Sequence, residues 1–362
     1  MQEGASPLEG AGSSAARTDA AVLDSPPGGD AVLDSSPAVA PAAHSILLHH
    51  ARGQVWVTPL GNGRHKITVR TARPSTIQFK GLETAYSVDL IRRTLAVTGP
   101  FALCDEIARD ESPEYTGAAL KWALLSYLGE EHFANKRILD FGCGSGASTV
   151  TLGRMFPSAS LVGVELRPAQ VELAAARADF LGVRNATFHV SPDGTQLPPN
   201  LGKFDFIVLC AVFEHLLPQE RTALLPALWD ALATGGVLFL RETPHRYFPI
   251  ETHTTGLPLI NYLPDSAARW TIRAFSKQWR RLDWPELLRA GVRGATEREI
   301  LRTLKPCAGT PRVLSPSRLG VEDRIDLWYL TAEKTRHART KRMIYRASKR
   351  LRRLAGIEFA PY

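Results

Sequence analysis

The chain has 362 residues and a net charge of +8, with 44% hydrophobic and 22% charged residues, which is typical of a globular protein with a sizeable core. Its four cysteines, Cys104, Cys143, Cys210 and Cys307, lie far apart and show neither zinc-finger nor CxxC spacing, which argues against a disulfide framework and a structural metal. The sequence has no apolar run of about 18 residues and no secretory signal pattern, so we expect a cytoplasmic protein.

The first segment, residues 1–44, is rich in Ala, Ser, Pro, Gly and Asp. Such a composition buries too little apolar surface to offset the entropy lost on ordering. We therefore expect a disordered leader over these residues.

An N-terminal cap is predicted over residues 45–130. Two alternating runs, Gln54–Thr58 and Lys66–Arg70, flank a turn at Gly61-Asn62-Gly63, which predicts a β-hairpin. Helical patterns follow around Val88–Leu95 and Gly117–Leu128.

From Arg137 the pattern changes to strands that alternate with helices. The strand candidates are Arg137–Phe141, Leu161–Glu165, Ala186–Val190, Phe204–Leu209 and Gly236–Arg241. The helix Pro168–Leu181 has an apolar face of Val171, Ala174, Ala175, Ala178 and Leu181, and Gly182 ends it. This alternation predicts an α/β fold with a doubly wound, mostly parallel Rossmann-like sheet over residues 131–331.

The first of these strands leads into the stretch RILDFGCGSGAST, Arg137–Thr149. Asp140 precedes Gly142, Gly144 and Gly146, and the third glycine comes one residue earlier than in the dinucleotide fingerprint GxGxxG. A carboxylate beside the loop repels phosphate and attracts an ammonium group. The expected ligand is therefore nucleoside-like, cationic and free of phosphate.

Two further acids follow the next two strands. Glu165 ends the second strand, where a carboxylate can accept both hydroxyls of a ribose. Asp193, followed by Gly194, comes after the third strand and can accept from an exocyclic amine such as that of adenine. The three acids thus suit an amino-acid end, a ribose and a base.

Between about Arg137 and Arg241 the sequence resembles the class I S-adenosylmethionine-dependent methyltransferases. The resemblance depends on the acid-GxGxG loop, Glu165, Asp193-Gly194 and FDFIVLCAVFEHL in the expected order. It implies S-adenosylmethionine as cofactor, with Asp140 holding its ammonium group, Glu165 its ribose and Asp193 its adenine amine. The implied cofactor-binding residues are Asp140, Gly142, Cys143, Gly144, Gly146, Glu165, Leu166, Asp193 and Gly194.

The segment after the fourth strand bears on the acceptor. Methyltransferases of nucleic acids and of glutamine carry Asn/Asp-Pro-Pro-aromatic there, whereas this chain has Cys210-Ala211-Val212-Phe213, followed by Glu214 and His215. This resembles small-molecule enzymes that act on quinones, sugars and natural products. We expect a small-molecule or glycan acceptor and argue against nucleic acid.

Methyl transfer to oxygen also requires removal of a proton, for which histidine is suited near neutral pH. The candidate catalytic residues are His253, His215 and His245. We favour His253, which lies in a substrate loop over residues 242–283, as the general base, whereas His215 can instead line the cofactor pocket. Two His and two Glu in this loop (Glu242, His245, Glu251, His253) could hold a divalent ion, but their spacing fits no metal motif, and we expect no metal.

Two other segments leave alternatives open. The acidic stretch CDEIARDESPEYTG, with Arg109 and Tyr115, is either a lid over the substrate or an ordinary charged helix end. Residues 332–362 hold ten Lys or Arg against two Glu, which equals the whole net charge. Here we expect a helix over Glu333–Leu354 with an apolar stripe of Met343, Ile344, Ala347, Leu351 and Leu354.

Three interpretations of this basic helix are considered: packing on the sheet with a solvated basic face, peripheral contact with an anionic membrane, and RNA binding. The first is favoured. Members of the resembled family end with a long antiparallel strand, but only Ile357–Tyr362 remains here, so that strand should be short or missing.

Taken together, the sequence predicts transfer of a methyl group from S-adenosylmethionine to a small-molecule or glycan acceptor, at oxygen. The alternatives are aminopropyl transfer, a catalytically silent cofactor-binding subunit that recruits a partner, and a nucleic-acid methyltransferase. Steep salt dependence of binding would indicate the last of these.

Overall fold

The computed structural model describes residues 44–71, 81–331 and 338–361. The predicted leader lies outside these residues, apart from His44.

The cap contains an antiparallel sheet in the order β1-β2-β3-β4. Its strands are β1 (Ile46–His50), β2 (Gly53–Pro59), β3 (His65–Thr71) and β4 (Gly81–Thr84). The predicted hairpin is confirmed as β2 and β3, in which Val55 faces Val69. Gly61, Asn62 and Gly63 have positive φ, as a tight turn between twisted strands requires. β1 and β4 were not predicted.

A long helix packs against this sheet. α1 (Val88–Glu111) extends well beyond the predicted Val88–Leu95, because the chain kinks at Gly99 before Pro100 and then resumes the helix. Ile91 and Ile107 of α1 share a buried core with Val57. The π-helix η2 (Pro113–Gly117) and α2 (Ala118–Leu125) lead to the 3-10 turn η3 (Glu130–Phe133) before the main sheet.

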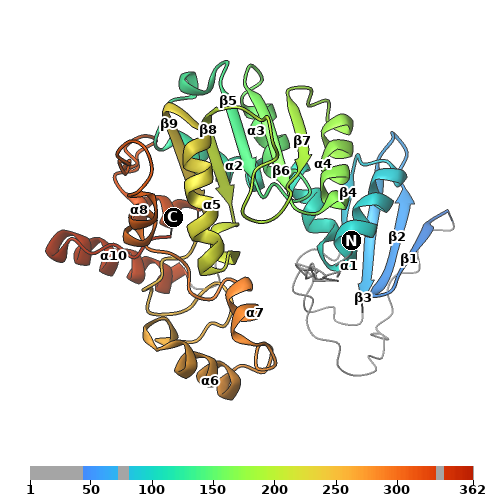
Figure 1. Cartoon of the computed structure of the whole chain (residues 1–362). Helices are drawn as coiled ribbons and strands as arrows, with labels where there is room; N and C mark the ends of the chain where they lie inside the picture. The colour runs from blue at the N-terminus through green and yellow to red at the C-terminus, as the bar shows by residue number, and fades with distance from the viewer. Residues whose placement is uncertain (1–43, 72–80, 332–337, 362) are drawn as a thin grey trace, which may run out of the picture. The chain divides into compact units, whose positions relative to one another are not determined.

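The main sheet confirms the predicted α/β fold. Its strands are β5 (Arg137–Phe141), β6 (Ser160–Glu165), β7 (Ala186–Val190), β8 (Phe204–Cys210) and β9 (Leu232–Arg241). All pairings are parallel, in the order β7-β6-β5-β8-β9 (Figure 1). The order reverses between β5 and β8, and ligands of doubly wound sheets bind at such a point, beyond the carboxyl ends of the strands.

Helices cover both faces of the sheet, because side chains alternate along each strand. Ile138 of β5 packs with α2 and α3 (Ala147–Met155) on one face. Its neighbour Leu139 packs on the other face with α5 (Pro218–Ala231) and Leu304 of α8 (Glu297–Leu304). α4 (Pro168–Phe180), the predicted helix between the second and third strands, contacts β6 and β7.

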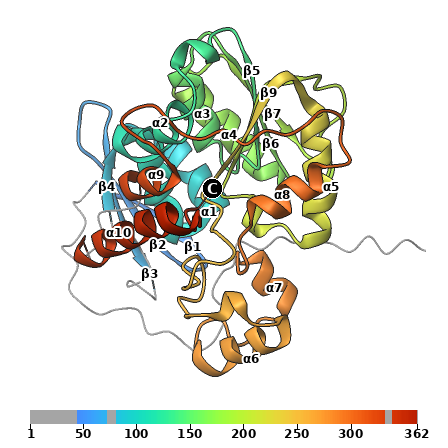
Figure 2. The same cartoon turned by 90° about the vertical axis from the view of Figure 1, so that its left-hand side faces the viewer.

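The segment predicted as a substrate loop contains more regular structure than expected. After β9 the chain forms the 3-10 turn η5 (Ile260–Tyr262), α6 (Asp265–Phe275) and α7 (Trp284–Arg289). α6 and α7 lie side by side in Figures 1 and 2. Ile260, Ile272, Leu287 and Val292 give this segment a small core of its own.

At the C-terminus, α9 (Arg324–Thr331) is followed by α10 (Ala338–Ala355), so the predicted basic helix exists. Its predicted apolar stripe is partly wrong, since Met343 and Leu354 are 65% and 76% exposed. α10 contacts α9, and Lys349 donates to Asp323 and Asp326 at 2.8 and 3.0 Å. Charged contacts thus hold this helix where an apolar stripe was expected.

The carboxyl end of the described chain adds no strand to the main sheet. Within residues 338–361 no strand occurs, so β9 forms the edge of the sheet in the described structure. The expectation of a short or missing final strand agrees with this. Among the described helices, none combines the length and apolarity needed to cross a bilayer. Membrane contact through α10 stays a prediction.

Candidate functional site

The glycine loop lies between β5 and α3, and its three glycines have different surroundings. Gly142, Gly144 and Gly146 all have positive φ, of 77°, 53° and 90°. A Cβ on Gly142 would stand 2.5 Å from Val212 Cγ2, and one on Gly146 would stand 2.7 Å from Ala174 Cβ. A Cβ on Gly144 would meet no described atom within 4 Å. Packing of the protein explains Gly142 and Gly146, whereas Gly144 faces open space that a ligand can enter.

Asp140 lies beneath this loop at the end of β5, with 1% of its surface exposed. Its Oδ2 accepts hydrogen bonds from Ser148 and Thr149 at 2.5 and 2.6 Å. Its Oδ1 is buried and accepts none from the residues that the structure describes. Burial raises the pKa of Asp140 despite the two hydroxyl donors. The unpartnered oxygen fits the predicted role of receiving a cationic donor, directly or through water.

Glu165 adjoins Gly144 directly. Its Oε2 accepts from the Gly144 amide at 3.2 Å, and its Oε1 accepts from the Arg167 amide at 3.1 Å. Leu166, between the two, is half-buried. The carboxylate therefore stands beside the open space at Gly144, where it can accept a pair of ribose hydroxyls as predicted.

The other two predicted cofactor positions have mainly local contacts. Asp193 Oδ1 accepts from the Thr195 amide and hydroxyl at 2.7 Å, and these bonds lower the pKa of Asp193. The side chain thus shapes the turn after β7, while Gly194 faces open space. Cys143 is buried, and its Sγ contacts the Gly144 carbonyl oxygen at 3.8 Å, so this side chain packs beneath the loop.

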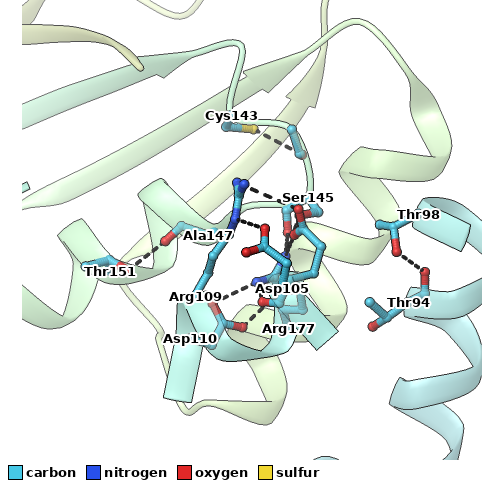
Figure 3. A network of polar contacts seen from close by, with 12 residues as sticks. Thr94, Thr98, Asp105, Arg109, Asp110, Cys143, Ser145, Ala147, Thr151 and Arg177 are labelled. Carbon is cyan, nitrogen blue, oxygen red and sulfur yellow. Dashed lines mark hydrogen bonds and ion pairs between the residues drawn. The ribbon is translucent and has the colours of Figure 1, made fainter. Parts of the chain in front are cut away.

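Sequence reasoning missed a buried ion-pair network that connects α1 and α4 to the glycine loop (Figure 3). Arg177 of α4 is completely buried and donates to Asp110 at 2.8 Å, to Glu106 at 2.8 Å and to the Ser145 carbonyl oxygen at 3.0 Å. Burial alone would lower the pKa of Arg177, but Asp110, Tyr86 and Glu106 raise it. The signal in the sequence was an arginine between Ala174 and Ala178 of the apolar face.

This network also places the stretch predicted as a lid or a charged helix end. Glu106 and Asp110 belong to α1, and Ser145 donates a short hydrogen bond to Glu106. Tyr115 donates to Asp105 at 2.6 Å. The stretch therefore packs against the glycine loop through buried charges, and the lid role stays a prediction.

A second cluster follows β8, the strand beside β5. Glu214 and His215 lie in the 3-10 turn η4 (Phe213–His215), and His253 comes from the segment after β9. One ligand atom from each of the three lies within 4.8 Å of the others. His215 Nε2 stands 3.8 Å from Glu214 Oε1, and the rings of His215 and His253 are 5.2 Å apart between centroids. Two of the three predicted catalytic histidines are thus brought together.

The surroundings of this cluster favour neutral imidazoles. Burial lowers the pKa of His215 and of His253 below the usual value. Burial also raises the pKa of Glu214 to about 7. His215 Nδ1 donates to the Arg289 carbonyl oxygen at 2.7 Å, which leaves Nε2 with a lone pair. The cluster can accept a proton or bind a cation.

Two of the four loop residues considered for a divalent ion, His245 and Glu251, lie outside the cluster. His245 is not part of the cluster, because its ring packs against Phe359 at 5.3 Å and its Nδ1 accepts from the Tyr247 amide. Burial lowers the pKa of His245 to about 4. Glu251 is buried and accepts from the amides of His253 and the two following residues, so its role is to shape the loop.

A large cavity of about 1010 Å³ runs along the open edge of β9. It is lined by β9, by parts of α2, α8 and α9, and by residues 308–314. Glu242 and His253 also line it, so the cavity reaches the histidine cluster from the side of the sheet edge.

Comparisons with known proteins agree with the glycine loop and the sheet. A family model described as a methyltransferase domain matches residues 138–236. The chain is 35% identical over 119 residues to trans-aconitate 2-methyltransferase of Methylobacterium radiotolerans. The matched segment covers 31% of this chain and 42% of that protein. It is also 30% identical over 128 residues to demethylmenaquinone methyltransferase of Thermus thermophilus. That matched segment covers 35% of this chain and 56% of that protein.

Among solved structures, the chain is similar to the S-adenosylmethionine-bound amino pentose methyltransferase of Micromonospora echinaspora. The identity is 29% and the TM-score 0.29, over 34% of this chain and 49% of that one. The chain spans about 42% and 56% of the length of these two curated relatives. Residues 138–236 form a methyltransferase domain of the class I, S-adenosylmethionine-dependent kind.

Proposed function

We propose that the protein transfers a methyl group from S-adenosylmethionine to an oxygen atom of a small-molecule or glycan acceptor. One observation supports this most strongly. The open glycine, Gly144, follows β5, and Glu214 and His215 follow the adjacent strand β8, where His253 from the segment after β9 joins them. A cofactor site and an acceptor site at the same edge of one sheet suit a group transfer.

The bound cofactor would supply a methyl group activated by its positive sulfur. The protein's part is to bind and orient. Asp140 would receive the ammonium group through its unpartnered Oδ1, and Glu165 the ribose hydroxyls. Gly194 leaves room for the base beside Asp193. The Arg177 network fixes the loop backbone at Ser145 and so preorganises the site.

The acceptor hydroxyl would lie at the histidine cluster. Neutral imidazoles offer lone pairs for the proton that an oxygen acceptor loses. His253 lines the cavity along β9 and is the ring that an acceptor entering from there would meet. The names of the two curated relatives, which concern trans-aconitate and demethylmenaquinone, support an acceptor of small-molecule size.

The experiment uses purified full-length chain, S-adenosylmethionine labelled in the methyl group, and a lysate divided into small-molecule, lipid-glycan, protein and nucleic-acid fractions. We expect label in the small-molecule or lipid-glycan fraction only, and its loss in Glu165→Ala. Glu172→Ala, at an exposed position of α4, is the matched control and should transfer normally.

Two results would overturn the proposal. Label in the nucleic-acid or protein fraction would exclude the acceptor class. Binding of S-adenosylhomocysteine without transfer to any fraction would instead favour a silent subunit that recruits a partner.

A further inference from the structure

The Glu214–His215–His253 cluster contains an electrostatic mismatch. His215 Nδ1 must carry the ring proton, because its partner is the Arg289 carbonyl oxygen, which can only accept. In the neutral ring Nε2 is then a bare lone pair, and it faces Glu214 Oε1 at 3.8 Å. Two acceptors therefore face each other across a short gap.

Glu214 makes the mismatch costly. Its side chain is fully buried, and Thr243 satisfies Oε2 with a hydrogen bond of 3.0 Å. Oε1 accepts no hydrogen bond from any group in residues 44–71, 81–331 or 338–361. A buried carboxylate oxygen without a partner is strongly unfavourable, so a cation or a proton belongs at this position.

The neighbouring arginines do not supply that charge. Arg221 directs its guanidinium to backbone carbonyl oxygens, including that of Glu214 at 3.3 Å, and to Glu299. Arg289 forms an ion pair with Glu220. Both cations are therefore used elsewhere.

The third residue of the cluster, His253, is positioned by a glycine that leaves room for its ring. Gly291 has a φ of 94°, and a Cβ there would stand 2.2 Å from His253 Cδ2 and 2.7 Å from its Nε2. Only glycine leaves room for the ring at this position. The Glu251 carboxylate also fixes this loop, by accepting from the His253 amide at 2.9 Å.

We propose that Glu214, His215 and His253 bind a divalent metal ion of the zinc type. Two imidazoles and one carboxylate form a known ligand set for zinc, and three protein ligands leave one position open. Ligands about 2.1 Å from a tetrahedral ion stand about 3.4 Å apart, so the three ligand atoms, which lie within 4.8 Å of one another, would draw closer by up to about 1.4 Å when the ion binds.

The contacts around the ligands are those that metal sites need. The Arg289 carbonyl oxygen orients the His215 ring, and the Thr243 hydroxyl orients the Glu214 carboxylate. Sequence spacing did not show this site, because Glu214 and His215 lie 39 and 38 residues before His253, outside the loop over residues 242–283.

The open position suggests a role, which rests on the proposed function. The acceptor hydroxyl would bind the ion, which would lower the pKa of that hydroxyl so that it gives its proton to solvent water before the oxygen takes the methyl group. In that case His215 and His253 hold the metal and do not themselves accept the acceptor's proton.

The test measures metal binding and needs no methyl transfer, so it can fail or succeed independently of the proposed function. Full-length protein is freed of metal with a chelator and titrated with Zn²⁺ alone against a chromophoric competitor. We expect one equivalent to bind, and affinity to fall at least about tenfold in Glu214→Gln and in His253→Ala. Mg²⁺ should compete poorly, because imidazole ligands suit zinc better.

His245→Ala is the matched control, since this histidine lies in the same segment but outside the cluster. It should bind Zn²⁺ like the wild type. Thermal melting of each metal-free variant shows whether it folds. Absence of saturable Zn²⁺ binding by the folded wild type would overturn the proposal and leave a proton on Glu214. Equal affinity in wild type, Glu214→Gln and His253→Ala would overturn it as well.

Discussion

At the scale of single residues, the glycine loop shows why three glycines in one motif need not serve the same purpose. Gly142 and Gly146 make room for Val212 and Ala174, which are parts of the protein itself. A side chain at Gly144 would contact no described atom, so packing of the protein does not require glycine there. Its amide donates a hydrogen bond to Glu165. We therefore propose Gly144 as the ligand-facing residue of the motif.

This difference predicts that alanine at Gly144 mainly weakens ligand binding, whereas alanine at Gly142 mainly lowers stability. Gly144→Ala should cost about 1–2 kcal/mol for a side chain at positive φ, yet keep the fold, while weakening S-adenosylhomocysteine binding at least about tenfold. Gly142→Ala should lose more stability, because its Cβ would overlap Val212, and overpacking adds about 1–3 kcal/mol. Calorimetric titration and thermal melting measure both quantities. Unchanged binding in Gly144→Ala would contradict the assignment.

At the scale of helices and strands, buried charge connects the cap to the core. Arg177 of α4 joins Glu106 and Asp110 of α1 to the glycine loop at Ser145. A carboxylate pair around one buried guanidinium holds two helices at a defined position, and removal of the guanidinium leaves both acids uncompensated.

Arg177→Met should therefore lower the free energy of unfolding by about 3–5 kcal/mol, measured by urea denaturation. The matched control is Arg184→Met, because Arg184 pairs with Asp179 where both side chains are about three-quarters exposed. That exposed pair should contribute at most about 1 kcal/mol. Equal losses in the two variants would show that the network does not stabilise the fold.

The C-terminal helix depends on a second charged cluster. Lys349 of α10 donates to Asp323, which is 1% exposed, and to Asp326. Lys349→Met leaves Asp323 with one cation, Arg352, and should destabilise the attachment of α10 by about 1–3 kcal/mol. Arg350→Met, at an exposed position of the same helix, should have little effect. Hydrogen exchange of α10 amides measures the difference.

The same cluster predicts a dependence on pH. Burial would raise the pKa of Asp326, but the hydrogen bonds from Lys349, the Glu322 amide and Tyr345 outweigh it and lower that pKa. Because the pKa of Asp326 is lower in the folded than in the unfolded protein, where it is about 3.9, the ionised carboxylate stabilises the fold at pH values above about 3.9. This stabilisation is lost as the pH falls through the pKa of the folded protein. Protection of α10 amides should therefore drop below about pH 4. Unchanged protection down to pH 2 would contradict this account.

At the scale of the whole molecule, the sequence predicted the sheet well because its central strands β5, β6 and β8 are local, mostly buried apolar runs. Arg137–Phe141 and Ala186–Val190 were predicted with the bounds that the structure has. What it could not predict depends on distant partners. In the sequence, Arg177 is a charged residue that interrupts an apolar face. Its partners in the structure, Glu106 and Asp110, lie about 70 positions earlier in the chain.

The candidate site shows the same limit. Glu165 and Asp140 follow from a motif of fixed order, so their positions near the glycine loop were predicted. The pairing of Glu214 and His215 with His253 depends on how the segment after β9 folds back to β8, and no local pattern encodes that contact. The buried face of α10 was partly mispredicted for a related reason, because Asp323 and Asp326 of the preceding segment attract Lys349 inward.

A crystal structure of the full chain with bound S-adenosylhomocysteine tests the central claim most directly. We predict density for the nucleoside over Gly144, with the ribose hydroxyls within hydrogen-bonding distance of the Glu165 carboxylate and the sulfur directed toward the Glu214–His215–His253 cluster. Density in the cavity along β9, with Gly144 and Glu165 uncontacted, would contradict the account.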